Sequence, residues 1–156
     1  MVLIGKEIEL VWDNCLNIAA FAGIGSLSGR TVNWFSKWTS APSFFKKTTQ
    51  VDLQSAVVCC ALFKTIDCVF YYNLRYLSRQ LFGEDVVDKP IYSALRLGTS
   101  AFWAIGLVHR FASHIKLASV ETKTGLAVIS TAMVIYNVIY WNLKEFNSHY
   151  QSVSSK

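Results

Sequence analysis

Long apolar runs, separated by short polar stretches, divide this chain of 156 residues into helical segments. The clearest run, residues 124–143, contains no charged residue. About 20 residues of α-helix cross the roughly 30 Å hydrocarbon core of a bilayer. Tyr136, Tyr140 and Trp141 gather near the end of this run and Lys144 follows, as in the aromatic belt of a membrane helix. We therefore predict a transmembrane helix over 124–143.

A second apolar run, residues 91–111, precedes it and is interrupted only by Arg96 and by basic residues at its end. Small residues recur within this run, and such a stripe lets a neighbouring membrane helix approach closely. The connection to the last run is short and polar, so the two segments should be antiparallel neighbours. The sequence thus predicts a C-terminal transmembrane hairpin. Its expected packing stripe consists of Ala94, Gly98 and Ala101.

Two further segments are less clearly spans. Segment 51–77 is broken by Lys64 and Asp67, and each charge at the centre of a membrane helix costs about 2.5–3.5 kcal/mol. It can span only if these charges face a partner helix or water. Segment 10–29 is a weaker helix, in which Gly25 and Gly29 form a GxxxG pairing motif. This segment fits a re-entrant or interfacial helix as well as a span.

Residues 30–50 alternate aromatic and basic side chains. Aromatic rings sit at headgroup depth, and each basic residue near an anionic surface adds about 1 kcal/mol of attraction. The pattern also fits single-stranded nucleic acid, but the flanking apolar segments favour a membrane surface. The lipid bilayer is therefore the expected partner, and nucleic acid an unlikely one. The expected lipid contacts are Arg30, Trp34, Lys37, Trp38, Lys46 and Lys47.

Together these patterns predict an all-α integral membrane bundle of three to four helices. We expect a membrane-associated region over 1–50, the transmembrane bundle over 51–143, and a polar, frayed tail over 144–156. The composition agrees, because 53% of residues are hydrophobic and 16% charged, where soluble domains carry about 25% charged residues. With four spans, Lys and Arg show no bias between the two sides. With three spans and the first fifty residues on one face, they place the N-terminus in the cytoplasm.

The ionisable residues of the apolar segments predict one cluster. Lys64 and Asp67 are three positions apart and so share a helical face. Antiparallel packing of 51–77 on 91–111 places Arg96 about one turn from Asp67. Ionisable residues inside a membrane usually serve an ion, a proton or a charged ligand. The alternative is a structural pair that sets helix register, or side chains that extend to the interface.

Other chemistry finds little support in the sequence. The four cysteines show no metal-ligand spacing, and His109 and His114 lack further ligands nearby. No nucleophile elbow and no glycine-rich phosphate loop occur. We therefore expect no enzyme activity, no cofactor and no metal site.

The favoured function is that of a small multi-pass scaffold or interaction subunit, in a membrane complex or in membrane remodelling, with a protein partner or further copies of itself. One alternative is a transporter or channel component that uses the charged cluster. Another is a soluble helical bundle with a very apolar core. In layout, the closing hairpin resembles the bilobed hydrophobic hairpins of chlamydial inclusion-membrane proteins, over about a third of the chain and without a shared motif. That resemblance implies a pathogen protein inserted in an inclusion membrane.

Overall fold

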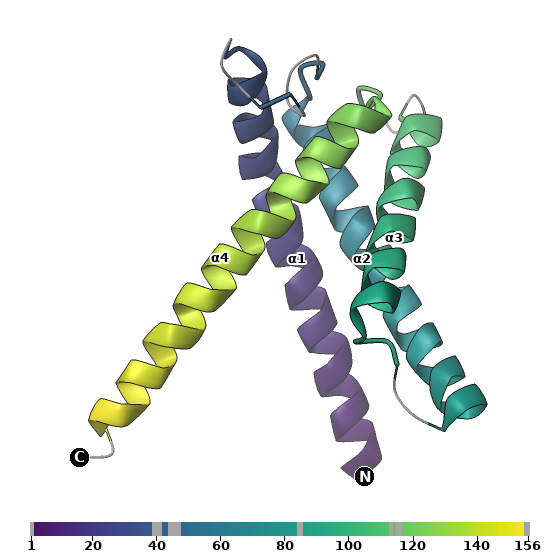
Figure 1. Ribbon diagram of the computed structural model, residues 1–156, viewed down its shortest axis with the longest axis vertical. Helices are drawn as coiled ribbons and strands as arrows, with labels where there is room; N and C mark the ends of the chain where they lie inside the picture. The colour runs from purple at the N-terminus through teal and green to yellow at the C-terminus, as the bar shows by residue number, and fades with distance from the viewer. Residues whose placement is uncertain are drawn as a thin grey trace.

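The computed structural model is an up-and-down arrangement of four α-helices (Figure 1). It describes the backbone of residues 2–38, 42–43, 48–83, 86–112, 114 and 117–154. Side chains are described for those of these residues that lie between 12 and 147. The described part of the chain contains no strand, so the all-α prediction is confirmed. The helices are α1 (Val2–Ser36), α2 (Leu53–Phe82), α3 (Pro90–Phe111) and α4 (Thr122–Ser154).

Three of these helices have the length and apolar composition needed to cross a membrane: Leu53–Phe82, Pro90–Phe111 and the Thr122–Asn147 part of α4. Large apolar side chains stand exposed along them, including Leu81, Phe102 and Trp141. So large an apolar surface would be unfavourable in water, whereas lipid chains cover it without cost. The chain is therefore a helical protein of membrane type.

Local signals explain where α2 begins and ends and where α3 begins. The carboxylate of Asp52 accepts a hydrogen bond from the backbone N–H of Ser55 at 3.1 Å and so caps the start of α2. Gly83 ends that helix with φ of 69°, a left-handed conformation that glycine adopts without strain. Pro90 opens α3, where its missing N–H leaves no helical hydrogen bond unmade.

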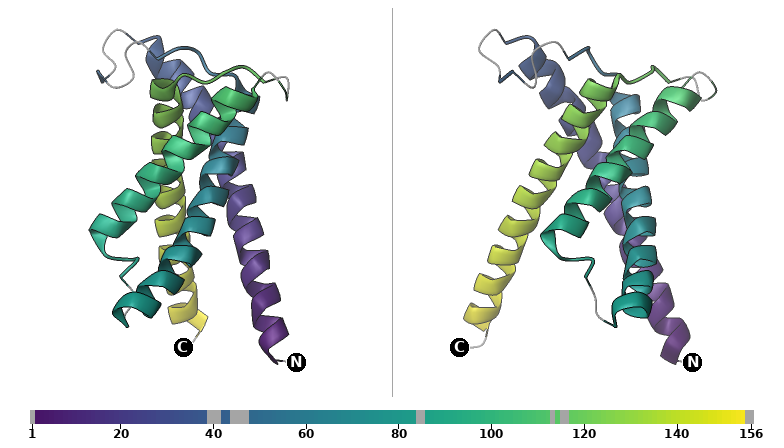
Figure 2. Two further views of the ribbon diagram at one scale, coloured as in Figure 1. Left: turned by 90° about the vertical axis from the view of Figure 1, so that its right-hand side faces the viewer. Right: turned by 45° about the vertical axis from the view of Figure 1, so that its right-hand side comes forward.

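Helix α1 differs most from the prediction, because it is 35 residues long and runs from one end of the bundle to the other (Figure 1). It packs chiefly on α2 and also on α4. The start of α1 and the end of α4 consequently lie at one end of the bundle, and the end of α1 and the start of α4 lie at the other (Figure 2). The start and the end of α1 thus lie at opposite ends of the bundle. The cytoplasmic N-terminus that the charge count favours stays a prediction.

The GxxxG motif is the reason why α1 packs so closely on α2. A Cβ atom at Gly25 would lie 2.9 Å from the Ala56 carbonyl oxygen and 3.0 Å from the Cβ of Cys60. At Gly29 it would lie 2.9 Å from the Ala56 Cβ. The two backbones therefore touch where only glycine fits, and the motif joins two helices of one chain.

Helices α3 and α4 are consecutive and antiparallel, and they contact each other near their connection. There Ile105 fills the space beside Gly125, where a Cβ would lie 2.7 Å from the Ile105 Cγ1. Farther from the connection the two helices diverge (Figure 1). The expected frayed tail is wrong over 144–154, because α4 continues to Ser154 and no proline or glycine interrupts that stretch.

Candidate functional site: a polar pocket between α1, α2 and α3

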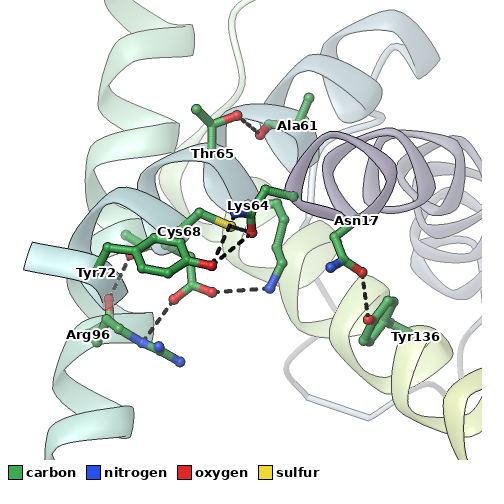
Figure 3. A network of polar contacts seen from close by, with 11 residues as sticks. Asn17, Ala61, Lys64, Thr65, Cys68, Tyr72, Arg96 and Tyr136 are labelled. Carbon is green, nitrogen blue, oxygen red and sulfur yellow. Dashed lines mark hydrogen bonds and ion pairs between the residues drawn. The ribbon is translucent and has the colours of Figure 1, made fainter. Parts of the chain in front are cut away.

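The pocket is built around the carboxylate of Asp67, halfway along α2. Its Oδ2 lies 3.3 Å from Lys64 Nζ, one turn earlier on the same helix. Its Oδ1 lies 3.0 Å from Nε of Arg96 on α3 (Figure 3). The structure thus brings together the three residues of the predicted cluster. Lys64 and Asp67 thus both face partner helices, which is the condition under which this segment can span a membrane.

This cluster is largely shielded from solvent, with exposed side-chain fractions of 5% for Asp67, 13% for Arg96 and 22% for Lys64. The Arg96–Asp67 contact is an ion pair whose angles do not make a hydrogen bond, so neither Nε nor Oδ1 has a hydrogen-bond partner among the described residues. Aromatic rings cover both cations. Arg96 lies 4.9 Å from the ring centre of Tyr71, and Lys64 lies 5.9 Å from that of Phe21. Such cation–π contacts offset part of the cost of burying the charges.

Helix α1 adds polar side chains that the sequence analysis did not connect with the cluster. Asn14 Nδ2 donates to the Tyr72 hydroxyl at 3.1 Å, and the Cys68 thiol donates to Asn14 Oδ1 at 3.7 Å. One turn further, Asn17 Oδ1 accepts from the hydroxyl of Tyr136 on α4 at 3.2 Å (Figure 3). The available signal was the spacing of the two asparagines, which places both on one face of an otherwise apolar helix.

These side chains surround a pocket of about 260 Å³ that is partly open. Two cations and one carboxylate line it, so its walls carry a net charge of +1. The described residues contain no group of three or more His, Cys, Asp or Glu that could hold a metal ion. The pocket is suited to a ligand that accepts hydrogen bonds and carries negative charge. Its lining consists of Asn14, Asn17, Lys64, Asp67, Cys68, Tyr71, Tyr72 and Arg96.

The predicted packing stripe is divided between two environments. Ala94, Gly98, Ala101 and Ile105 lie along one side of α3, with spacings of four, three and four. Ala101 and Ile105 are buried, since α4 is close at that end. Ala94 and Gly98 are exposed, because α4 has diverged, and nothing lies within 4 Å of a Cβ at Gly98. Ile91, Leu95, Thr99 and Phe102 border the open groove around them.

Four of the six predicted lipid-contact residues lie in the last turns of α1 or directly after it. Arg30 and Trp34 belong to the last turns of α1, and Lys37 and Trp38 follow directly. The rings of Trp34 and Trp38 are 4.0 Å apart between centroids, and both are about half exposed. The remaining two, Lys46 and Lys47, lie outside the described residues.

The fold and the pocket define a class: a small polytopic helical membrane protein with a charged cluster between its helices. Comparisons with protein-family models, with curated proteins and with solved structures find no match for this chain. The resemblance of the closing hairpin to inclusion-membrane proteins therefore stays one of layout.

Proposed function

We propose that this protein is a membrane-embedded interaction subunit that associates with a second copy of itself through the open side of α3. The observation that carries this proposal is the divergence of α3 and α4, which leaves Ala94 and Gly98 without a neighbouring helix. Large apolar side chains, Leu95 and Phe102, flank this strip of small residues.

The packing of α1 on α2 supports the proposal from within the same chain. There Gly25 and Gly29 allow two helices to touch at backbone distance. In lipid, helices associate through such close packing, since apolar burial alone gives no advantage over contact with lipid chains. A glycine on α3 that faces open space provides the same surface, and a second copy brings an identical α3 to meet it.

A Gly98→Leu substitution tests this role. Because nothing surrounds a Cβ at Gly98, we expect the leucine to leave unfolding unchanged and to weaken self-association at least tenfold. Single-molecule photobleaching in nanodiscs or liposomes measures the oligomer distribution. Gly106→Leu is the matched control, since Gly106 is also exposed and unencumbered but lies about two turns further along α3, beyond the residues that line the groove. A monomeric native protein at high density, or equal association in both variants, would refute the proposal.

A second candidate function, a transporter or channel component, is favoured by the charged pocket at mid-length of α2. Ionisable groups at such depth often line ion or substrate pathways. If the pocket conducts, proteoliposomes should pass anions at a rate well above protein-free liposomes, and Arg96→Gln should remove that flux. Arg110→Gln, which changes an exposed arginine of α3, should conduct normally. Flux equal to the protein-free background would eliminate this candidate.

A further inference from the structure

We infer that the pocket between α1, α2 and α3 binds a small oxyanion, a carboxylate or phosphate group, through Arg96, Lys64 and Asn17. The inference goes beyond the interaction role of α3. It uses the same pocket as the transport candidate but rests only on binding, so an oxyanion that binds without flux would refute transport and leave this inference standing.

The walls of the pocket carry an excess of positive charge. Arg96 and Lys64 carry two positive charges, and Asp67 neutralises one of them. Among the described side chains no other charged one lines the pocket, and those of α1 that do are the neutral Asn14 and Asn17. An uncompensated charge is strongly unfavourable in surroundings of low dielectric constant. The rings over both cations offset this only in part, and a bound anion would complete the neutralisation.

The pocket also offers hydrogen-bond donors that an oxyanion would use. Arg96 directs only its Nε toward Asp67. Its two terminal nitrogens point away from the carboxylate in Figure 3 and meet no acceptor among the described residues. The planar pair of N–H groups at the end of a guanidinium matches two oxygens of a carboxylate or phosphate. An oxyanion therefore suits this donor set better than a spherical halide does.

Two other donors converge on the same space. The oxygen of Asn17 is engaged by Tyr136, whereas its Nδ2 donates to no residue in the described part of the chain. Lys64 donates one hydrogen bond, to Asp67. Because an ammonium group has three protons to donate, further donors remain for a ligand. With Arg96, the donors thus come from all three helices that line the pocket.

Size and depth limit the ligand. A water molecule takes about 30 Å³ in the liquid, so a pocket of about 260 Å³ accepts a carboxylate or phosphate group together with some water. Asp67 is the fifteenth residue of the 30-residue α2, roughly 20 Å from each helix end at 1.5 Å per residue. A dissolved carboxylate or phosphate and the phosphate of a lipid headgroup share this chemistry, and the experiment separates them.

The test is thermal unfolding of the full-length protein in phosphatidylcholine nanodiscs. Sodium acetate or sodium phosphate replaces sodium chloride at constant ionic strength. A bound oxyanion should raise the melting temperature saturably, by a few degrees, because it binds only the folded state. Arg96→Gln and Lys64→Gln should each raise the half-saturating concentration at least tenfold, while Arg110→Gln should leave it unchanged.

Asp67→Asn provides a readout with the opposite sign. Removal of the competing negative charge leaves two cations facing the ligand, so the half-saturating oxyanion concentration should fall at least tenfold. A pocket that bound cations would respond in the reverse direction, and that result would overturn the inference.

The source of the oxyanion is distinguished by native mass spectrometry of protein from phosphatidylglycerol nanodiscs. A lipid headgroup is the ligand if the native protein retains phosphatidylglycerol, Arg96→Gln loses it, and the melting temperature of the native protein in these nanodiscs does not respond to acetate. A melting response without retained lipid identifies a dissolved oxyanion. If native protein shows neither response, or if Arg96→Gln responds like the native protein, the inference is wrong.

Discussion

Asp67→Asn should lower the free energy of unfolding by about 3–5 kcal/mol in chloride buffer without acetate or phosphate, because it leaves two buried cations without their counter-charge. Lys64 and Arg96 both lie within 3.3 Å of this carboxylate, and their side chains are largely shielded from solvent. Reversible unfolding by sodium dodecyl sulfate in mixed micelles measures the change. Asp13→Asn removes an exposed carboxylate from α1 and should have almost no effect.

A double-mutant cycle identifies the origin of this loss. Arg96→Leu alone leaves Asp67 with only Lys64, so it should also destabilise the fold. Combining it with Asp67→Asn removes a pair of opposite charges, and the double variant should be more stable than the sum of the single losses implies. Strictly additive losses would contradict an energetic link between Asp67 and Arg96.

The second large effect concerns the contact between α1 and α2. Gly25→Ala should destabilise the protein by about 1–3 kcal/mol, because the added methyl group would lie 2.9 Å from the backbone oxygen of Ala56, which cannot rotate away. Gly23→Ala is the matched control two residues earlier, where a methyl group meets nothing within 4 Å. That change should be neutral or stabilising by up to about 1 kcal/mol, since alanine favours a helix over glycine. The same unfolding assay compares both variants.

The Gly25 contact and the pocket should be linked. Asn14 and Asn17 belong to the same helix as Gly25, and α1 holds them against α2. A methyl group that pushes α1 away should also weaken the bond from Asn14 to Tyr72. If Gly25→Ala and Gly23→Ala prove equally stable, α1 and α2 do not pack through this glycine, and the position of α1 over the pocket would need another explanation.

The sequence alone determined the helical class and the principal segments. Runs such as 124–143 are uncharged over the thickness of a bilayer, and this property depends only on composition along the chain. The cluster of Lys64, Asp67 and Arg96 also followed from local rules. Helical spacing places the first two on one face, and a short connection makes the next segment antiparallel, so the position of Arg96 could be counted along the helices.

Only the tertiary structure decided the role of α1, the polar wall of the pocket and the division of the α3 stripe. Asn14 meets Tyr72 across 58 positions and Asn17 meets Tyr136 across 119, and no periodicity encodes such pairings. Whether Gly98 faces a helix or open space depends on the angle at which α4 leaves α3, which no local pattern of α3 specifies. Periodicity assigns a residue to a side of its helix, whereas the packing of several helices determines what lies opposite it.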